Sequence, residues 1–311
     1  MRRCPLSYEP LPEGHSYSEA GLRRLHPRLA SLDDLPLTAQ EIRREAAQRM
    51  AKMSIQGVQP KVSLRLHLSE GRFEVVDYHG SYILKPAVEE WPNVPENEDL
   101  TMRLAAIAGI EVPSHGLIRA SDRSLAFVIR RFDRVGRRQR LALEDFAQLS
   151  GRDRDTKYDS STEQLISVIN QHTTFPVLDR LKLFRRLLFC FLTGNEDAHL
   201  KNWSLLTSND IIGLSPAYDF VNTWIVLNNP TEELALPLAG KKSNFKRSDF
   251  VDYLAKDRLA LNDAIIDDEL NRISNAIVQW TPMIRSSFLP VKDQDRYLSI
   301  VRERASRVGL A

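Results

Sequence analysis

The spacing of the apolar residues changes once along the chain, and this change limits the possible folds more than any other feature. From residue 62 apolar and polar residues alternate, which predicts a half-buried strand. The alternating apolar residues are Val62, Leu64, Leu66 and Leu68. From about Asp145 the apolar residues recur at helical spacing instead. We therefore expect an α+β protein, with a β-rich N-terminal lobe over residues 1–144 and a mainly helical C-terminal lobe over residues 145–311.

Composition excludes several classes of protein. The 311 residues carry 43 Lys and Arg against 41 Asp and Glu, and this net charge of +2 argues against a dedicated polybasic nucleic-acid binder. The two cysteines, Cys4 and Cys190, provide neither a disulfide framework nor a cysteine-based zinc site. The longest apolar segment, Leu187–Thr193, is shorter than a membrane span. The residues after Met1 do not have the pattern of a secretory signal. We expect a cytoplasmic protein.

The first half reads as strands interrupted by one helix. Strands are expected over residues 62–68, 73–78, 82–85, 112–118 and 125–132. The first three are expected to form a meander that stops at Pro86. A helix that Asn97 caps and Gly109 ends should follow them. Short helices over residues 18–25 and 38–53 come earlier, and Thr38 and Glu41 form a capping-box pattern in the second.

The second half reads as helices around one hairpin. Helices are expected over residues 163–171 and 178–192, and the region 249–309 is also helical in pattern. Two short strands, 203–206 and 211–214, should fold around a turn at 207–210. Residues 224–311 hold no motif that can be assigned to a function.

The segment Gly194–Asn202 contains the residues that most strongly suggest catalysis. Asp197 and Asn202 are separated by four residues, which is the spacing of a phosphotransferase catalytic loop. In such a loop the aspartate accepts or orients the attacking hydroxyl and the asparagine binds the metal. Alone the spacing is a weak signal, because it also occurs in solvated turns. The hairpin that follows should return Asp219 beside Asn202, and two oxygen ligands of this kind suit Mg²⁺.

The first half points to the same chemistry. Lys85 lies on the third expected strand and Glu98 on the helix after it, the arrangement in which kinases hold the ATP phosphates. Glu96 and Asp99 are rival partners for Lys85. The connector at residues 143–146 would be the hinge that reads adenine, and the segment 53–61 would cover the phosphates.

Several segments together resemble the HipA family of serine/threonine kinases, the toxins of bacterial toxin–antitoxin modules. They are SIQGVQPK (54–61), YILKP (82–86), ENE (96–98), FVIRRFDR (127–134), LEDFAQ (143–148), GNEDAHLKN (194–202) and LSPAYD (214–219). They are collinear and cover roughly residues 53–223. The resemblance implies a bilobal protein-kinase-like fold and an enzyme that uses ATP and Mg²⁺.

The resemblance also implies roles for individual residues. Asp197 would be the catalytic base, and Asn202 and Asp219 would hold Mg²⁺. The nucleotide would contact Gln56, Gly57, Val58, Gln59, Lys61, Lys85, Glu98, Glu144, Asp145, Phe146, His199, Lys201 and Tyr218. Ser54 matches the loop serine that such kinases autophosphorylate, and a phosphate there would repel those of ATP. Because Gln56 stands where some relatives carry a second serine, one loop phosphosite is expected.

Only 53 residues precede Ser54, which is similar to the short HipT toxins of three-gene modules. That likeness implies a small HipS-like partner and a HipB-like helix-turn-helix protein that binds DNA in place of this chain. By the same analogy the substrate would be an aminoacyl-tRNA synthetase, tryptophanyl-tRNA synthetase in the case of HipT. The basic turn at Arg130–Arg140 could meet an acidic partner, although a solvated basic hairpin is the favoured interpretation.

Three alternatives remain open. The chain could be a pseudokinase that binds antitoxin proteins, although it retains Lys85, Asp197, Asn202 and Asp219. It could be a small-molecule phosphotransferase, because such enzymes share the Asp–Asn spacing. A metal hydrolase using His199 and Asp197 is disfavoured, because no other histidine clusters there.

Overall fold

The computed structural model describes residues 2–52, 60–91, 93–136, 139–153, 155–227 and 230–310. Its chain forms two compact units. The first comprises Met1–Asp99, Pro113–Gln139 and Ser286–Leu289, and the second comprises Leu100–Val112, Arg140–Arg285 and Pro290–Ala311. The expected α+β class is confirmed. Ser54, Gln56, Gly57, Val58 and Gln59 of the predicted phosphate loop lie outside the described residues.

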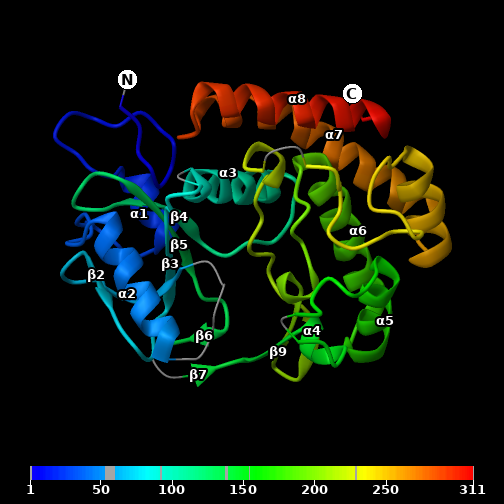
Figure 1. The fold of residues 1–311 in the computed structure, drawn as a ribbon, viewed down its shortest axis with the longest axis horizontal. Coiled ribbons are helices and arrows are strands. Elements are labelled where there is room, and N and C mark those ends of the chain that lie inside the picture. The colour runs from blue at the N-terminus through cyan, green and yellow to red at the C-terminus, as the bar shows by residue number, and fades with distance from the viewer. Residues whose placement is uncertain are drawn as a thin grey trace. The chain divides into compact units, whose positions relative to one another are not determined.

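The first unit is built on a five-stranded sheet with the strand order β2-β1-β3-β5-β4. Figure 1 labels β2, β3, β4 and β5 of this sheet. Its strands are β1 (Val62–His67), β2 (Arg72–Val75), β3 (Tyr82–Pro86), β4 (His115–Arg119) and β5 (Leu125–Arg130). Every neighbouring pair is antiparallel. This order puts β3, the strand that carries Lys85, at the centre of the sheet. A central strand is paired along both edges, so it gives Lys85 a rigid support.

The expected meander is wrong, because β1 pairs with both β2 and β3 and leaves β2 at the edge. The chain must cross the end of β1 to reach its other side. It does so close to the strand: Val76 N donates to Ser63 O at 2.9 Å, and a Cβ added to Gly80 would lie 3.0 Å from the carbonyl oxygen of Leu64. Glycine therefore permits a crossing that alternation of apolar residues does not reveal.

Two helices cover this sheet. Helix α1 (Glu19–Leu25) begins at Ser18, whose hydroxyl accepts from Gly21 N. Helix α2 (Ala39–Lys52) follows the predicted capping box, in which Glu41 N donates to Thr38 Oγ1 at 3.2 Å and Thr38 N donates to Glu41 Oε2 at 2.8 Å. Helix α2 packs on β1 and β3, and α1 packs on β4. Their apolar faces and the sheet form one buried core.

Helix α3 (Val94–Ile107) starts earlier than its predicted cap, Asn97. The N–H of Asn97 donates to Asn93 O at 3.0 Å, and its side chain is fully buried, so the prediction of an N-cap there is wrong. Pro95 in the first turn explains the earlier start, because proline fits that position without losing a hydrogen bond. The predicted end is confirmed: Gly109 has a φ of +76°, and Ile110 N donates to Ala105 O at 3.0 Å.

The second unit contains a three-stranded antiparallel sheet with the order β10-β9-β8. The predicted hairpin is present as β9 (Ser204–Ser208) and β10 (Ile211–Leu214), joined at Asn209 and Asp210, which both have positive φ. Strand β8 (Ala142–Asp145) pairs with β9. The residues at the predicted lobe boundary near Glu144 therefore belong to this sheet. Short strands β6 (Arg134–Val135) and β7 (Gln139–Arg140) form a separate ribbon.

The rest of the second unit is helical, as expected. Its helices are α4 (Phe146–Leu149), α5 (Thr162–His172), α6 (Pro176–Thr193), η1 (Leu200–Asn202), η2 (Thr223–Ile225), the π-helical η3 (Asp249–Arg258), α7 (Asp263–Ser286) and α8 (Val291–Arg307). Helix α6 is the core element. Its Phe189 ring packs 5.6 Å from Trp280 of α7, and its Phe191 ring packs 4.9 Å from Phe250 of η3. The end of α6 is therefore held firmly where the catalytic-loop motif begins.

Within the described part of the chain, no helix is long and apolar enough to cross a membrane. Cys4 and Cys190 are both buried and free.

Candidate active site

The predicted catalytic loop leaves the end of α6 through Gly194. This glycine has a φ of +73°, and a Cβ there would lie 2.7 Å from Asn222 Oδ1, so both conformation and space require glycine. The backbone of Asp197 is then fixed at both ends. Its N–H donates to Asn195 Oδ1 at 3.1 Å, and its carbonyl oxygen accepts from His199 N at 2.7 Å.

The Asp197 side chain is exposed and has one partner among the described residues. The phenol of Tyr158 donates to its Oδ1. The Tyr158 ring also meets the His199 ring edge-on, with centroids 5.0 Å apart and planes at 86°. Tyr158 precedes Asp197 by 39 residues in an irregular segment, so no motif or spacing in the sequence pointed to it.

Asn202 and Asp219 lie side by side, as the hairpin predicted. Asn202 Nδ2 donates to Asp219 Oδ2 at 2.9 Å. Asp219 has a φ of +63°, a left-handed conformation that aspartate tolerates better than most residues and that occurs frequently at functional sites. Asn202 is buried, and its Oδ1 atom has no hydrogen-bond partner in the described part of the chain.

This pair fits Mg²⁺ better than a transition metal. Among the described residues, no group of three His, Cys, Asp or Glu side chains could hold a metal ion. A buried amide oxygen without a partner beside a carboxylate instead offers two hard oxygen ligands. Mg²⁺ binds through one or two such protein groups and takes its other ligands from water and phosphates. Asn202 and Asp219 thus fit the ion that the sequence predicted.

Other predicted nucleotide contacts gather around the same segment. Lys201 Nζ lies 3.4 Å from Asp145 Oδ2, and the Tyr218 hydroxyl donates to Lys201 O at 3.0 Å. Burial raises the pKa of Tyr218, so its hydroxyl stays protonated. Phe146 is fully buried, and its N–H donates to Trp203 O at 2.9 Å. These contacts join the end of β8, which includes Glu144, to the catalytic loop within the second unit.

His199 is a buried neutral histidine. Burial lowers its pKa below the usual value, and Asp197 opposes that shift only partly. Its Nδ1 atom is buried without a partner among the described residues. A neutral imidazole cannot add positive charge beside Asp197, but it offers one polar nitrogen to a ligand.

The first unit supplies the predicted lysine–glutamate pair. Lys85 Nζ donates to Glu98 Oε1 at 2.7 Å, and the two side chains are 12% and 1% exposed. Of the rival partners, Asp99 accepts from His115 Nδ1 at 2.8 Å. Burial raises the pKa of Glu96 to about 7, and no cation is among the groups that act on that pKa. Lys61 stands exposed just before β1. The structure therefore selects Glu98 as the partner of Lys85.

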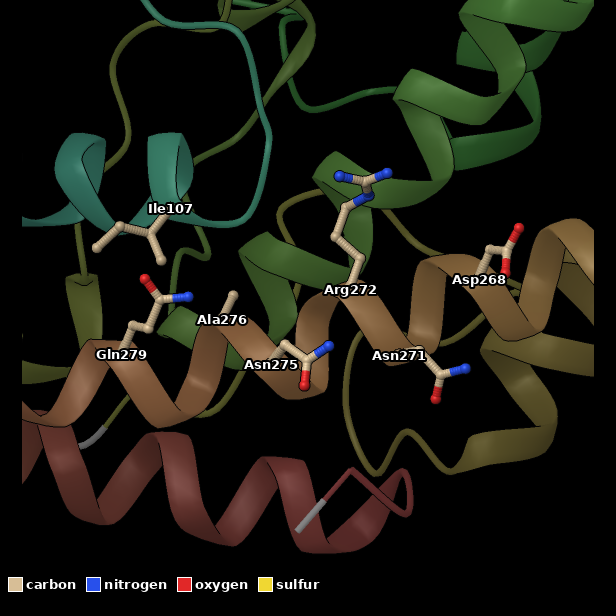
Figure 2. A pocket seen from close by; sticks show the side chains of 7 residues that line it. All are labelled: Ile107, Asp268, Asn271, Arg272, Asn275, Ala276 and Gln279. Atoms are coloured by element: carbon tan, nitrogen blue, oxygen red, sulfur yellow. The ribbon is translucent and has the colours of Figure 1, made fainter.

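A depression of about 440 Å³ lies elsewhere, on α7 (Figure 2). It is lined by Ile107, Asp268, Asn271, Arg272, Asn275, Ala276 and Gln279. Its polar groups are mainly amides along one exposed helix face, and none of the predicted catalytic residues lines it. Concavity alone therefore does not identify the active site of this chain.

Comparison with known proteins identifies the family of the chain. The profile of the HipA-like C-terminal domain matches residues 53–281. The chain belongs to this family. It is 31% identical to a predicted kinase of Haemophilus influenzae, over all of this chain and 98% of that protein. It is 29% identical to the serine/threonine-protein kinase toxin HipA of Shewanella oneidensis, over 55% of this chain and 43% of that one.

Solved structures show the same fold. The Shewanella oneidensis HipA chain, solved with HipB and operator DNA, matches 96% of this chain with a TM-score of 0.69 at 21% identity. The proinflammatory kinase CtkA of Helicobacter pylori matches 74% of this chain with a TM-score of 0.54 at 18% identity. The chain is thus a HipA-family, kinase-like α+β protein, and ATP is the nucleotide that this family implies.

Proposed function

We propose that the chain is a serine/threonine-protein kinase toxin that transfers the γ-phosphoryl group of ATP to a protein hydroxyl. The observation that carries this proposal lies in the second unit, where exposed Asp197 shares a loop with Asn202, and Asn202 donates a hydrogen bond to Asp219. A pseudokinase would have no need of an accessible carboxylate at this position. The intact Lys85–Glu98 pair gives independent support.

The mechanism follows from these groups. Asp197 accepts the proton of the substrate hydroxyl, whose oxygen forms a bond to the γ-phosphorus while the bond to the β–γ bridging oxygen breaks and ADP leaves. Lys85, held by Glu98, binds the phosphates. Asn202 and Asp219 would hold Mg²⁺, which would supply positive charge to neutralise the phosphates.

The remaining nucleotide contacts are proposed at three places. Glu144, Asp145 and Phe146 would face adenine, and the polar atoms of His199, Lys201 and Tyr218 lie around the same loop. The segment Gln56–Lys61 would cover the phosphates. Its glycine and backbone N–H groups suit an anion, although one glycine is fewer than most phosphate loops contain.

Regulation would act through Ser54. A phosphate at this position would place two negative charges beside the segment that binds those of ATP, and would oppose binding. Mass spectrometry of the full chain after incubation with ATP tests this. Ser54 is the only residue with a hydroxyl group in the segment 53–61, so phosphate elsewhere in the chain with none on Ser54 would contradict the proposal.

Partners and acceptor are proposed by analogy. The Shewanella HipA structure contains HipB and operator DNA. We propose that a HipB-like helix-turn-helix protein also binds this chain, together with a small HipS-like protein. The acceptor would be an aminoacyl-tRNA synthetase, tryptophanyl-tRNA synthetase first among them.

The function is tested by transfer of label from [γ-³²P]ATP to purified synthetases. Wild type with Mg²⁺ should label tryptophanyl-tRNA synthetase, and Asp197→Gln should not. Label in glutamyl-tRNA synthetase alone would keep the kinase and change its substrate. ATP binding with no ADP formed in any mixture would favour the pseudokinase, and transfer only to small alcohols would favour a small-molecule phosphotransferase.

A further inference from the structure

Tyr158 touches the proposed base but belongs to no motif that identified the site. It lies between α4 and α5, and its hydroxyl donates to Asp197 Oδ1. Tyr158 is 38% exposed. Its partial burial and the Asp197 carboxylate beside it raise the pKa of the phenol, so the phenol keeps its proton and acts as a donor. A hydrogen bond to one oxygen of Asp197 can affect how this carboxylate acts as a general base.

The backbone of Asp197 is fixed by hydrogen bonds, but its side chain can still rotate. Its N–H and its carbonyl oxygen are both hydrogen-bonded within the loop. The residue is exposed, so packing does not fix the carboxylate. Tyr158 supplies the missing constraint on Oδ1, and among the described residues no side chain donates to Oδ2. An incoming hydroxyl can therefore use Oδ2.

The segment that carries Tyr158 is itself tied down. Lys157 O accepts from Leu200 N at 3.3 Å, which joins it to the end of the catalytic loop. Its start is closed by Asp153 Oδ1, which accepts from Asp155 N and Thr156 N, each at 2.9 Å. The Tyr158 ring packs edge-on against His199. A tyrosine anchored at backbone and ring can orient its partner.

We propose that Tyr158 is a positioning residue, which holds Asp197 Oδ1 so that Oδ2 faces the acceptor hydroxyl. This inference rests on the proposed function, because it assumes that Asp197 is the base. Tyr158 does not touch the reacting atoms. Its effect is on the fraction of time that Asp197 spends in the reactive orientation, and thus on kcat rather than on nucleotide binding.

The test compares Tyr158→Phe with Tyr253→Phe in the full-length chain. Phenylalanine keeps the ring beside His199 and removes only the hydroxyl. Tyr253 is a matched control, because its hydroxyl donates to Glu163 Oε1 at 2.8 Å away from the catalytic loop. The rate of ADP formation from Mg-ATP is measured with and without tryptophanyl-tRNA synthetase, together with the KM for ATP and the Tm.

We expect Tyr158→Phe to lower kcat about ten-fold, because one charge-assisted hydrogen bond to the base is lost. KM for ATP should be unchanged, and Tm should fall no further than in Tyr253→Phe, which also loses one tyrosine–carboxylate hydrogen bond. Tyr253→Phe should match wild type in kcat. An unchanged kcat in Tyr158→Phe would overturn the inference, and so would a raised kcat, which would mean that the phenol competes with the acceptor. A parallel fall in Tm and rise in KM would show a merely structural role, and also overturns it.

The experiments distinguish an error about Asp197 as the base from an error about Tyr158 as the residue that positions it. If Asp197→Gln is as active as wild type, the proposed base is wrong, whatever Tyr158→Phe does. If wild type forms no ADP, crystal structures of wild type and Tyr158→Phe decide the inference. It predicts different Asp197 side-chain torsions in the two, and identical torsions would contradict it.

Discussion

The Lys85–Glu98 pair and the Asn202–Asp219 pair belong to different units and are built differently. Lys85 and Glu98 carry opposite charges, lie on a central strand and a helix, and are almost fully buried. Asn202 and Asp219 join a neutral amide to a carboxylate. Asn202 ends the short helix η1, and Asp219 lies on an irregular segment after the hairpin.

The difference shows how each pair is stabilised. The first pair neutralises itself, so it contributes to the fold whether or not a nucleotide is bound. The second pair has more acceptors than donors, and a cation would balance it. Substitutions should therefore affect folding mostly in the first pair and ligand binding mostly in the second.

The largest effect should come from Asp219→Asn. Asparagine also tolerates positive φ, so the fold should be retained while the negative charge that holds Mg²⁺ is lost. We expect transfer to fall about 10³-fold, since metal stabilisation of phosphoryl transfer is worth several kcal/mol. At a hundred times its Kd, Mg-ATP should raise the free energy of unfolding of wild type by about 2.7 kcal/mol, as measured by thermal melts. The same ligand should raise that of Asp219→Asn much less.

Asp210→Asn is the matched control for this variant, because Asp210 is an exposed aspartate with a φ of +61° in the β9–β10 turn. It should melt and react like wild type. An Asp219→Asn protein that keeps the full Mg-ATP shift would show that the second pair does not hold the metal.

Lys85→Met should affect stability and activity together. It leaves Glu98 without its lysine partner in a buried site, which costs about 3 kcal/mol of unfolding free energy, measured by urea titration. Adding Glu98→Gln should recover at least half of that loss, but not activity, because the lysine for the phosphates is still missing.

Arg65→Met is the contrasting control on the same sheet. Arg65 and Glu74 are 3.5 Å apart and nearly half exposed, so breaking their pair should cost below about 1 kcal/mol. If Lys85→Met and Arg65→Met lowered the free energy of unfolding equally, the buried Lys85–Glu98 pair would contribute no more to stability than a surface pair.

The smallest effect is a pH dependence of the first unit. Burial raises the pKa of Glu96 to about 7, so the folded chain holds this proton over a range in which the unfolded chain releases it. The stability that Glu96 contributes is present below its unfolded pKa, near 4.5, and is lost as pH rises through 7.

Glu96→Gln should therefore raise the unfolding free energy at pH 8.5 by about 1–3 kcal/mol relative to its effect at pH 4.5. Thermal and urea unfolding at both pH values measure this, with exposed Glu90→Gln as control. A Glu96→Gln effect that is the same at both pH values would show that Glu96 ionises normally.

The sequence predicted the parts of the site that depend on local geometry. The sequence shows an apolar helix, then a glycine, then a two-strand hairpin. Because a hairpin reverses the chain, it brings Asp219 back beside Asn202. The helix after the third strand likewise offered Lys85 three acidic partners, and only the direction of each side chain on α3 selected Glu98.

Features that depend on distant contacts could not be predicted. The place of β3 inside the sheet follows from the close crossing at Gly80, not from alternation along β1. Helix α3 begins at Val94, before the predicted cap Asn97, because Pro95 fits its first turn. Tyr158 reaches Asp197 through an irregular segment, and no local pattern encodes such an approach.

The central claim, that Asp197 is the base of a phosphoryl transfer, is tested most directly by single-turnover transfer from [γ-³²P]ATP with Mg²⁺ in wild type and Asp197→Asn. Asp197→Asn should melt and bind Mg-ATP like wild type but transfer phosphate about 10²–10⁴ times more slowly. Transfer by Asp197→Asn at the wild-type rate would contradict it.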